Sequence, residues 1–409
     1  MTNKENQIEL ISRGAERVFE IEDLAFKLDK SIATGKPLIV KLGVDPTAPD
    51  IHLGHTVPLR KLLHFQQLGH EVVFLIGDFT GRIGDPSGRD KTRPPLTEEQ
   101  ILANAQTYLD QISKILDTTK LKVVYNSHWL NNLNFRELIK MAANTTMSKM
   151  LEHNTFRQRI DSSESIRMHE LLYPFMQGFD SVALKADVEL GGSDQTFNLA
   201  FGRDLQRFYN QEPQVCITMP ILTGTDGVQK MSKSLGNYIG IDEPASVMFD
   251  KLMQMKDSNI INYFLLLTDV PLHEIKSIES KFEKGAETSF IVECKKRLAF
   301  EIIKTYHNEA MATEIVNSYG KLDKAGIPEL IVNDLIENDG VLDVILLLKN
   351  QLGVESLNQA RRLVAQGAVS HNGNKLSIEL VRVPIQNGDI IKFGKTKSVK
   401  LLLSEDGIN

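Results

Sequence analysis

The stretch PLIVKLGVDPTAPDIHLGHTVPLRKLLHFQQLGHEVVFLI, residues 37–76, contains the clearest secondary-structure pattern in the chain. It begins with an apolar, β-branched segment over 37–44. A helical pattern follows over about 54–68 and stops at Gly69, and a buried strand is expected over 72–76. Strand, helix and buried strand within about 40 residues form a βαβ unit. The stretch therefore predicts a parallel sheet of the α/β class.

The same alternation continues on both sides of this stretch. Residues 5–31 have a helical pattern, and Thr97 and Gln100 form the ends of a capping box that opens another helix. Additional strands are expected over 121–125, 186–189 and 214–218, and additional helices over 97–116, 134–184, 194–209 and 244–320. The long helical run after 244 indicates a helical domain that follows the α/β domain.

A boundary is expected near the end of that helical run. Residues 321–341 are acidic and contain Gly-Ile-Pro and Asn-Asp-Gly breakers, so they indicate a linker. Beyond it, two short helical patterns precede strand-like runs separated by Asn-Gly turns, which predicts a compact α+β module. The predicted division is an N-terminal helical segment over 1–35, a Rossmann-like catalytic domain over 36–225, a loop and helical domain over 226–320, the linker over 321–341 and the α+β module over 342–409.

Composition excludes several classes of protein. With 42% hydrophobic and 24% charged residues, the chain of 409 residues resembles globular proteins and not disordered or collagen-like ones. No apolar run approaches the roughly 18 residues that span a bilayer, and the polar, mixed-charge N-terminus resembles no targeting peptide. Cys216 and Cys294 have no partners at metal-ligand spacing, which fits a reducing compartment. We therefore expect a cytoplasmic protein with no membrane segment.

Charge is distributed unevenly. Residues 342–409 contain nine basic and six acidic residues, a net charge of +3, so the remaining 341 residues carry −9 of the total of −6. A basic module on an acidic body is consistent with a polyanion partner. From charge alone, an ordinary solvated surface is the favoured explanation.

The first motif that indicates chemistry is His52-Leu53-Gly54-His55. Its two imidazoles are three residues apart at the expected start of a helix, where backbone N–H groups and the helix dipole favour an anion such as phosphate. Gly54 has no side chain, so a flat base can approach the backbone. A surface histidine pair is the plain alternative, and a zinc hydrolase would need a His-Glu-x-x-His pattern that is absent. No protein metal site is predicted.

The second motif is Lys230-Met231-Ser232-Lys233-Ser234, which follows Gly224-Thr225-Asp226-Gly227 and lacks regular periodicity. The motif is therefore expected on a loop. Two ammonium groups on such a loop can close on a triphosphate and neutralise charge on a leaving pyrophosphate. An exposed basic loop is the alternative when this motif is taken alone.

A third pattern lies on one predicted helix. Tyr173, Gln177 and Asp180 are at positions i, i+4 and i+7, which share one helix face. This face presents a hydroxyl, an amide and a carboxylate between apolar neighbours. A polar face toward water would have the same spacing.

Taken together, these motifs carry a resemblance. The first motif followed about 175 residues later by the second resembles the double signature of class I aminoacyl-tRNA synthetases. Further segments narrow the likeness to the bacterial tyrosyl-tRNA synthetases, over nearly the whole chain. They are Asp45-Pro46-Thr47, Gly77-Asp78-Phe79-Thr80-Gly81, Gly84-Asp85-Pro86-Ser87-Gly88, the Tyr173–Gln177–Asp180 face and Gly191-Gly192-Ser193-Asp194-Gln195. The module over 342–409 is similar to the S-four-like RNA-binding domain of many such enzymes.

The resemblance implies an activity, a set of ligands and roles for residues. The activity is a tyrosine–tRNA ligase that uses ATP with Mg²⁺ as a substrate complex and no tightly bound cofactor. The implied partners are tRNA(Tyr), L-tyrosine and a second copy in a homodimer. The implied catalytic residues are His52, His55, Lys230, Lys233 and Thr47, and the implied ATP-binding residues are His52, Gly54, His55, Gly192, Asp194, Lys230, Ser232 and Lys233. Tyrosine is expected to contact Asp45, Asp78, Asp85, Tyr173, Gln177, Asp180 and Gln195, and RNA is expected to contact Arg361, Arg362, Lys392, Lys395 and Lys397.

One position departs from the family pattern. Many bacterial tyrosyl enzymes have Tyr-Cys-Gly-Phe-Asp, whose Tyr contacts the substrate phenol, where this chain has Lys41-Leu42-Gly43-Val44-Asp45. The chain then belongs to a second branch with another phenol contact, for which Asp78 is a candidate, or its substrate differs. A tryptophanyl enzyme, a catalytically inactive RNA-binding relative and a general nucleotidyltransferase are the alternatives.

Overall fold

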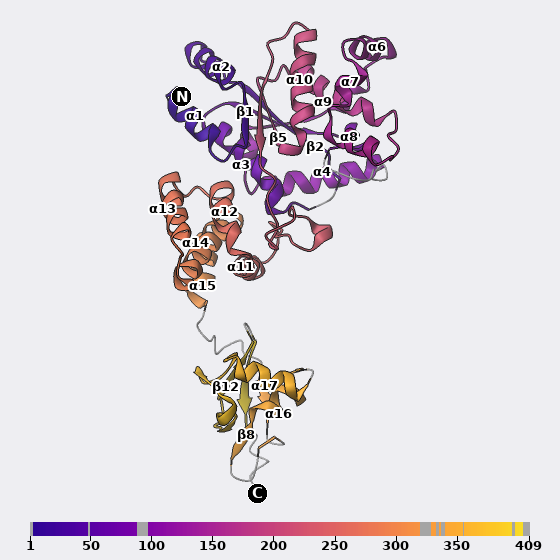
Figure 1. The fold of residues 1–409 in the computed structure, drawn as a ribbon. Coiled ribbons are helices and arrows are strands. Elements are labelled where there is room, and N and C mark those ends of the chain that lie inside the picture. Colours follow the sequence, from indigo (N-terminus) through magenta and orange to yellow (C-terminus); the bar gives the residue numbers. More distant parts are fainter. Residues whose placement is uncertain are drawn as a thin grey trace. The chain divides into compact units, whose positions relative to one another are not determined.

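The computed structural model describes residues 3–47, 50–87, 97–319, 329–332, 335–336, 340–354, 356–394 and 397–403. By contacts the chain divides into two compact units, Met1–Val316 and Asn317–Asn409 (Figure 1). Within the described ranges, no helix is both long enough and apolar enough to cross a membrane.

A six-stranded sheet forms the centre of the first unit, with the strand order β1-β6-β5-β2-β3-β4. Its strands are β1 (Arg17–Phe19), β2 (Ile39–Val44), β3 (Glu71–Ile76), β4 (Leu121–Tyr125), β5 (Val188–Gly192) and β6 (Val215–Met219). All neighbouring pairs are parallel except β1 and β6. The predicted α/β class with a parallel sheet is therefore confirmed.

The N-terminal segment differs from its prediction. Residues 5–31 are not helical throughout, because α1 (Lys4–Ser12) ends just before Gly14 and β1 then pairs antiparallel with β6 before α2 (Ile21–Thr34) begins. Gly14 has a φ of 64°, a left-handed conformation that favours glycine and ends a helix. The three residues of β1 are too few for a recognisable alternation of apolar and polar residues, but Gly14 was a usable signal.

Helices cover both faces of this sheet. On one face, α3 (Leu53–Gln67) contacts β2, β3 and β5; on the other, α9 (Tyr173–Leu184) contacts β2, and α10 (Thr196–Phe208) contacts β5 and β6. Alternate side chains of β2 point to opposite faces. Val40 and Leu42 therefore pack in the apolar core shared with α3, while Lys41 reaches α9.

The first unit also contains helices between the strands of the sheet and after the last strand. They are α4 (Glu98–Ile112), α5 (Ser127–Leu130), α6 (Phe135–Ala143), α7 (Met147–Met150), α8 (Asn154–Asp161), α11 (Ala245–Gln254), α12 (Ile260–Leu267), α13 (Leu272–Glu283), α14 (Thr288–Tyr306) and α15 (Glu309–Ser318). The predicted capping box is present at the start of α4, where Thr97 and Gln100 exchange side-chain to backbone hydrogen bonds.

The second unit is a small α+β structure with its own apolar core. Its five-stranded sheet has the order β10-β9-β12-β13-β7, and β8 and β11 form a separate pair. The elements are β7 (Glu329–Ile331), β8 (Val341–Asp343), α16 (Val344–Asn350), α17 (Leu357–Ala365), β9 (Val369–His371), β10 (Asn374–Lys375), β11 (Arg382–Pro384), β12 (Ile390–Phe393) and β13 (Lys397–Leu402). Strand β7 falls inside the stretch predicted as a linker. These residues form a strand because they pair in parallel with β13. Most of that stretch lies outside the described residues.

Candidate active site

A cleft of about 960 Å³ opens where β2 and β5 end at their carboxyl ends. In the sheet, β2 lies between β3, the next strand along the chain, and β5. The order in which strands are added to the sheet therefore reverses at β2. Open α/β sheets bind ligands at such a switch point. The cleft is lined by residues of both sequence motifs, and Leu53 N–H donates to the Ile239 carbonyl at 2.9 Å. The two distant segments therefore meet at one site.

The histidine motif forms the N-terminus of α3. His52 is the N-cap residue; its Nδ1 accepts from the Gly54 N–H at 3.2 Å, and His55 Nδ1 accepts from the His52 N–H at 3.3 Å. The two rings stack with centroids 3.8 Å apart. An Nδ1 that accepts leaves the proton on Nε2, so each neutral ring has an N–H to donate.

His52 acts as a neutral donor rather than as a charge. Burial, together with the neighbouring His55 and the positive Lys233, lowers the pKa of His52 to about 3. At neutral pH its contribution to an anion is therefore a hydrogen bond from Nε2. The positive charge of the site comes from the lysines.

The lysine motif lies beside α3, on the predicted loop up to Ser232 and then on a short 3-10 helix, Lys233–Leu235. Asn237 holds this loop, since its side chain accepts from the Ser232 N–H at 2.8 Å and donates to the Lys230 carbonyl at 3.1 Å. Lys233 forms an ion pair with Asp50 and lies 5.7 Å from the centre of the Tyr238 ring. Lys230, Ser232 and Lys233 all line the cleft.

A cluster of carboxylates lines the same cleft. Asp45 follows β2 and accepts from Thr80 Oγ1 at 2.6 Å and from the Tyr173 hydroxyl at 2.9 Å. Burial raises the pKa of Asp45 to about 7, and the nearby carboxylates Asp85 and Asp180 add to the rise. Such a cluster favours a cationic ligand, because a bound cation relieves the mutual repulsion of the carboxylates.

Asp180 is the most enclosed member of this cluster. Its side chain is 2% exposed and accepts from Trp129 Nε1 at 2.7 Å and from Asn126 Nδ2 at 3.3 Å. Burial raises its pKa to about 7, against the opposing effects of Lys41 and these two donors. Asn126 also donates to Thr80 Oγ1 at 3.0 Å, which links Asp180 to the partners of Asp45.

The end of β5, which includes Gly191 and Gly192, and the short 3-10 turn Ser193–Gln195 bring the last predicted residues to the cleft. Gln195 Nε2 donates to Asp85 Oδ2 at 2.7 Å, and burial raises the pKa of Asp85. A Cβ at Gly192 would lie 2.5 Å from Asp194 Oδ1, so any larger residue here would displace the Asp194 carboxylate. Thr47, Gly192, Asp194 and Gln195 all line the cleft.

One expected residue, Asp78, does not reach the cleft, and neither does Lys41, which replaces the family tyrosine. Asp78 is not among its lining residues, and its Oδ1 accepts from the Ser127 N–H at 2.9 Å, which leaves its expected role as a phenol contact unsupported. Lys41 is also absent from the lining and instead forms an ion pair with Glu189 at 3.2 Å. The donors that do hold Asp180, Trp129 and Asn126, were missed; they follow β4, and the end of a parallel strand beside β3 was the available signal.

The residues predicted to contact RNA belong to the second unit. Arg361 and Arg362 are exposed on α17, and Lys392 is half-buried on β12. Lys397 is the first residue of β13, and Lys395 lies outside the described residues. In the part of the chain that the structure describes, no group of three or more His, Cys, Asp or Glu side chains is arranged to hold a metal ion.

Comparisons with known proteins agree with the geometry. Residues 33–321 match the family model described as tRNA synthetases class I (W and Y). The tyrosine–tRNA ligase of Moorella thermoacetica is 49% identical over 97% of this chain and 95% of its own length, and that of Carboxydothermus hydrogenoformans is 48% identical over 98% of both. A tyrosyl-tRNA synthetase of Archaeoglobus fulgidus, solved with L-tyrosine, shares the fold with a TM-score of 0.61 and 23% identity over 77% of this chain and all of its own. The chain thus belongs to the class I aminoacyl-tRNA synthetases, in the family of the bacterial tyrosyl-tRNA synthetases.

Proposed function

We propose that this protein is a tyrosine–tRNA ligase that joins tyrosine to AMP with release of pyrophosphate and then transfers the tyrosyl group to the 3′-terminal ribose of tRNA(Tyr). The observation that carries the proposal is the single cleft in which the histidine motif, the lysine motif and Asp180 meet. The names of close, nearly full-length relatives support the same reaction.

The carboxylate cluster suits the amino acid. Asp180 is held by two N–H donors, and its remaining lone pairs can accept the phenol hydroxyl of tyrosine. Asp45, Asp85, Tyr173 and Gln177 surround the place proposed for the ammonium group, and Gln195 is proposed near the carboxylate. Phenylalanine is disfavoured because it would leave the buried Asp180 without its hydroxyl donor.

The other part of the cleft suits ATP. In the first step, a carboxylate oxygen of tyrosine forms a bond to the α-phosphorus, and the bond from that phosphorus to the pyrophosphate oxygen breaks. The carboxylate is already ionised, so no general base is needed, and catalysis rests on position and charge. Lys230 and Lys233 would neutralise the leaving pyrophosphate, while His52 and His55 would donate from Nε2.

Further contacts complete the proposed nucleotide site. All of these residues line the cleft: Gly54 is proposed to leave room for the base, Thr47 and Ser232 to lie beside the phosphates, and Gly192 and Asp194 to lie at the ribose. Mg²⁺ would arrive with ATP, held mainly by phosphate oxygens as that ion commonly is.

The second unit is proposed to bind tRNA. Exposed Arg361 and Arg362 on α17 are placed for phosphate contacts, which contribute affinity but little sequence information. The predicted domain division, a homodimer and a cytoplasmic location also remain proposals; the last two rest on the family likeness.

One assay tests the reaction. Radioactive pyrophosphate should exchange into ATP only when tyrosine is supplied among the twenty amino acids. Exchange with tryptophan alone would identify the other enzyme of this family, and exchange with none would identify an inactive relative.

The Arg361→Ala/Arg362→Ala variant should keep this exchange while tRNA charging weakens, with a reduced dependence on salt. Unchanged charging would remove the second unit from tRNA binding.

A further inference from the structure

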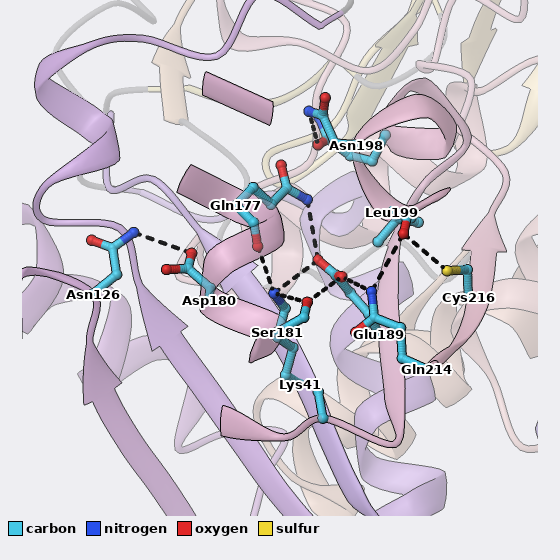
Figure 2. Close-up of polar contacts among 12 residues, drawn as sticks. Lys41, Asn126, Gln177, Asp180, Ser181, Glu189, Asn198, Leu199, Gln214 and Cys216 are labelled. Atoms are coloured by element: carbon cyan, nitrogen blue, oxygen red, sulfur yellow. Dashed lines mark hydrogen bonds and ion pairs between the residues drawn. The ribbon is translucent and has the colours of Figure 1, made fainter. Parts of the chain in front are cut away.

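Strand register brings an ion pair under the amino-acid site. In the parallel pairing of β2 and β5, Lys41 is the direct neighbour of Glu189, and both side chains leave the sheet on the face that α9 covers. Each is 1% exposed, and Lys41 Nζ lies 3.2 Å from Glu189 Oε1 (Figure 2). A buried pair of charges is costly unless further hydrogen bonds satisfy it. The partners of this pair therefore show what the charges hold in place.

Lys41 uses all three of its N–H donors inside the protein. Besides Glu189, its Nζ donates to the Gln177 backbone carbonyl at 3.1 Å and to Ser181 Oγ at 2.7 Å. Both acceptors belong to α9, the helix that also carries Asp180. Lys41 thus ties β2 to α9 and has no donor left for a ligand, unlike the tyrosine that the family usually has here.

Glu189 determines how the Gln177 side chain is turned. Glu189 Oε1 accepts from Gln177 Nε2 at 3.1 Å, and Oε2 accepts from Ser181 Oγ at 3.0 Å and from Gln214 Nε2. An ionised carboxylate can only accept, so the amide of Gln177 must turn its nitrogen toward Glu189. Figure 2 shows the Gln177 amide oxygen on the side away from Glu189, and Gln177 lines the cleft.

That orientation matters for the ligand. An ammonium group only donates hydrogen bonds, so it needs the oxygen of Gln177 and is repelled by the NH₂. A neutral carboxylic acid or an amide at position 189 could donate as well as accept, and the orientation of Gln177 would no longer be decided.

We infer that the Lys41–Glu189 ion pair is a positioning element for substrate recognition, which fixes Gln177 so that its amide oxygen faces the ammonium group of the amino acid. This inference rests on the proposed function. Lys41 and Glu189 act through Gln177 and do not themselves touch the substrate. The substitution of lysine for the usual tyrosine thereby exchanges a direct phenol contact for an indirect ammonium contact.

The test replaces both charges together, so that neither is left buried without a partner. In the Lys41→Met/Glu189→Gln variant, the KM for tyrosine in pyrophosphate exchange and the inhibition constant of tyramine, which keeps the ammonium group, should both rise about tenfold, the scale of one hydrogen bond to a charged group. The inhibition constant of 3-(4-hydroxyphenyl)propanoate, which lacks the ammonium group, and kcat should stay unchanged.

A matched pair controls for the loss of buried charge. Arg159 and Glu170 also form a buried ion pair, and their side chains hydrogen-bond the backbone of Ser165 and Arg167, which lie outside the cleft lining. The Arg159→Met/Glu170→Gln variant should leave all three ligand constants unchanged. If the first double variant does not fold, Ser181→Ala removes the hydroxyl between Lys41 and Glu189 and should produce the same order of effects at smaller size.

Two outcomes overturn the inference. Equal weakening of all three ligands would mean that the pair only supports the fold, and no weakening of any ligand would mean that Gln177 is oriented without it. The proposed function is judged separately, because it fails only if the unaltered protein shows no exchange with tyrosine.

Discussion

The cleft contains two groups of charged side chains that are held in different ways. In the acidic group, Asp45 lies at the end of β2, Asp180 on α9 and Asp85 on the segment that follows β3, and each carboxylate accepts hydrogen bonds from neighbouring side chains. The basic group, Lys230 and Lys233, lies on a loop; Lys233 has a side chain 33% exposed and is paired with the exposed Asp50. Exposed ion pairs of this kind contribute little stability, so Lys233 can exchange Asp50 for a phosphate at small cost.

This difference separates recognition from catalysis. Discrimination between similar amino acids requires groups fixed within a fraction of an ångström, which a packed helix and strand ends provide. Phosphate charge moves during the reaction, and a loop can follow it. The acidic group should therefore control which amino acid binds, and the basic group should control how fast the adenylate forms.

The largest effect is expected from the basic group. Lys233→Ala should slow adenylate formation roughly 100-fold or more, because a charge that faces the leaving pyrophosphate is lost. The affinity for tyrosine should stay the same. Stopped-flow fluorescence measures both quantities. Lys251→Ala is the matched control, since Lys251 also lies over the Tyr238 ring but does not line the cleft. Adenylate formation at the normal rate in Lys233→Ala would end the proposed role of this lysine.

The acidic group should show the reverse pattern. Asp180→Ala should reduce the preference for tyrosine over phenylalanine by at least about tenfold, because the phenol loses a charged acceptor. The ratio of kcat/KM for the two amino acids in pyrophosphate exchange measures this preference. Asp78→Asn is the control and should keep the preference. A comparable loss in that variant would show that Asp78 reaches the phenol when tyrosine is bound.

A smaller effect is expected from pH. Asp45 and Asp180 each have a pKa raised from 3.8 to about 7, chiefly by burial. Because an ammonium group and a phenol bind the ionised forms, tyrosine affinity should rise from pH 6 to pH 8, and binding at pH 7 should release protons. Calorimetry in two buffers of different ionisation enthalpy measures that release. Affinity that is flat across this range would contradict the assignment.

The same raised pKa values have a consequence for stability. The folded state holds these protons more tightly than the unfolded state, so the two carboxyl groups contribute stability fully below about pH 4 and lose it as the pH rises through 7. Because tyrosine binds the ionised forms of these two groups, it should raise the melting temperature more at pH 8 than at pH 6.

Much of this architecture could be predicted from sequence, for identifiable reasons. The β2–α3–β3 unit has a strong local pattern, and Asp45, His52 and Gln195 follow strands whose carboxyl ends must share one edge of a parallel sheet. The end of β4 indicates this edge of the sheet, but the contact of Trp129 and Asn126 with Asp180 does not follow from it, because that contact depends on how α5 packs beside α9. The ion-pair partner of Lys41 could not be predicted either, because the register between β2 and β5 pairs residues that are 148 positions apart in the chain.

The smallest expected effect tests the packing beneath the acidic group. A Cβ at Gly202 of α10 would lie 2.8 Å from Gln214 Nε2 and 3.3 Å from Ser181 Oγ, so Gly202→Ala must displace groups that hold Glu189. The free energy of unfolding should fall by about 1–3 kcal/mol, with a rise of a few-fold in the KM for tyrosine and none for ATP. Gly81→Ala is the control for stability, since its nearest neighbour, Ile101 Cδ1, would be 3.7 Å away. Equal changes in both KM values would show that the two groups of the cleft share one support, and the separation of recognition from catalysis would then be lost.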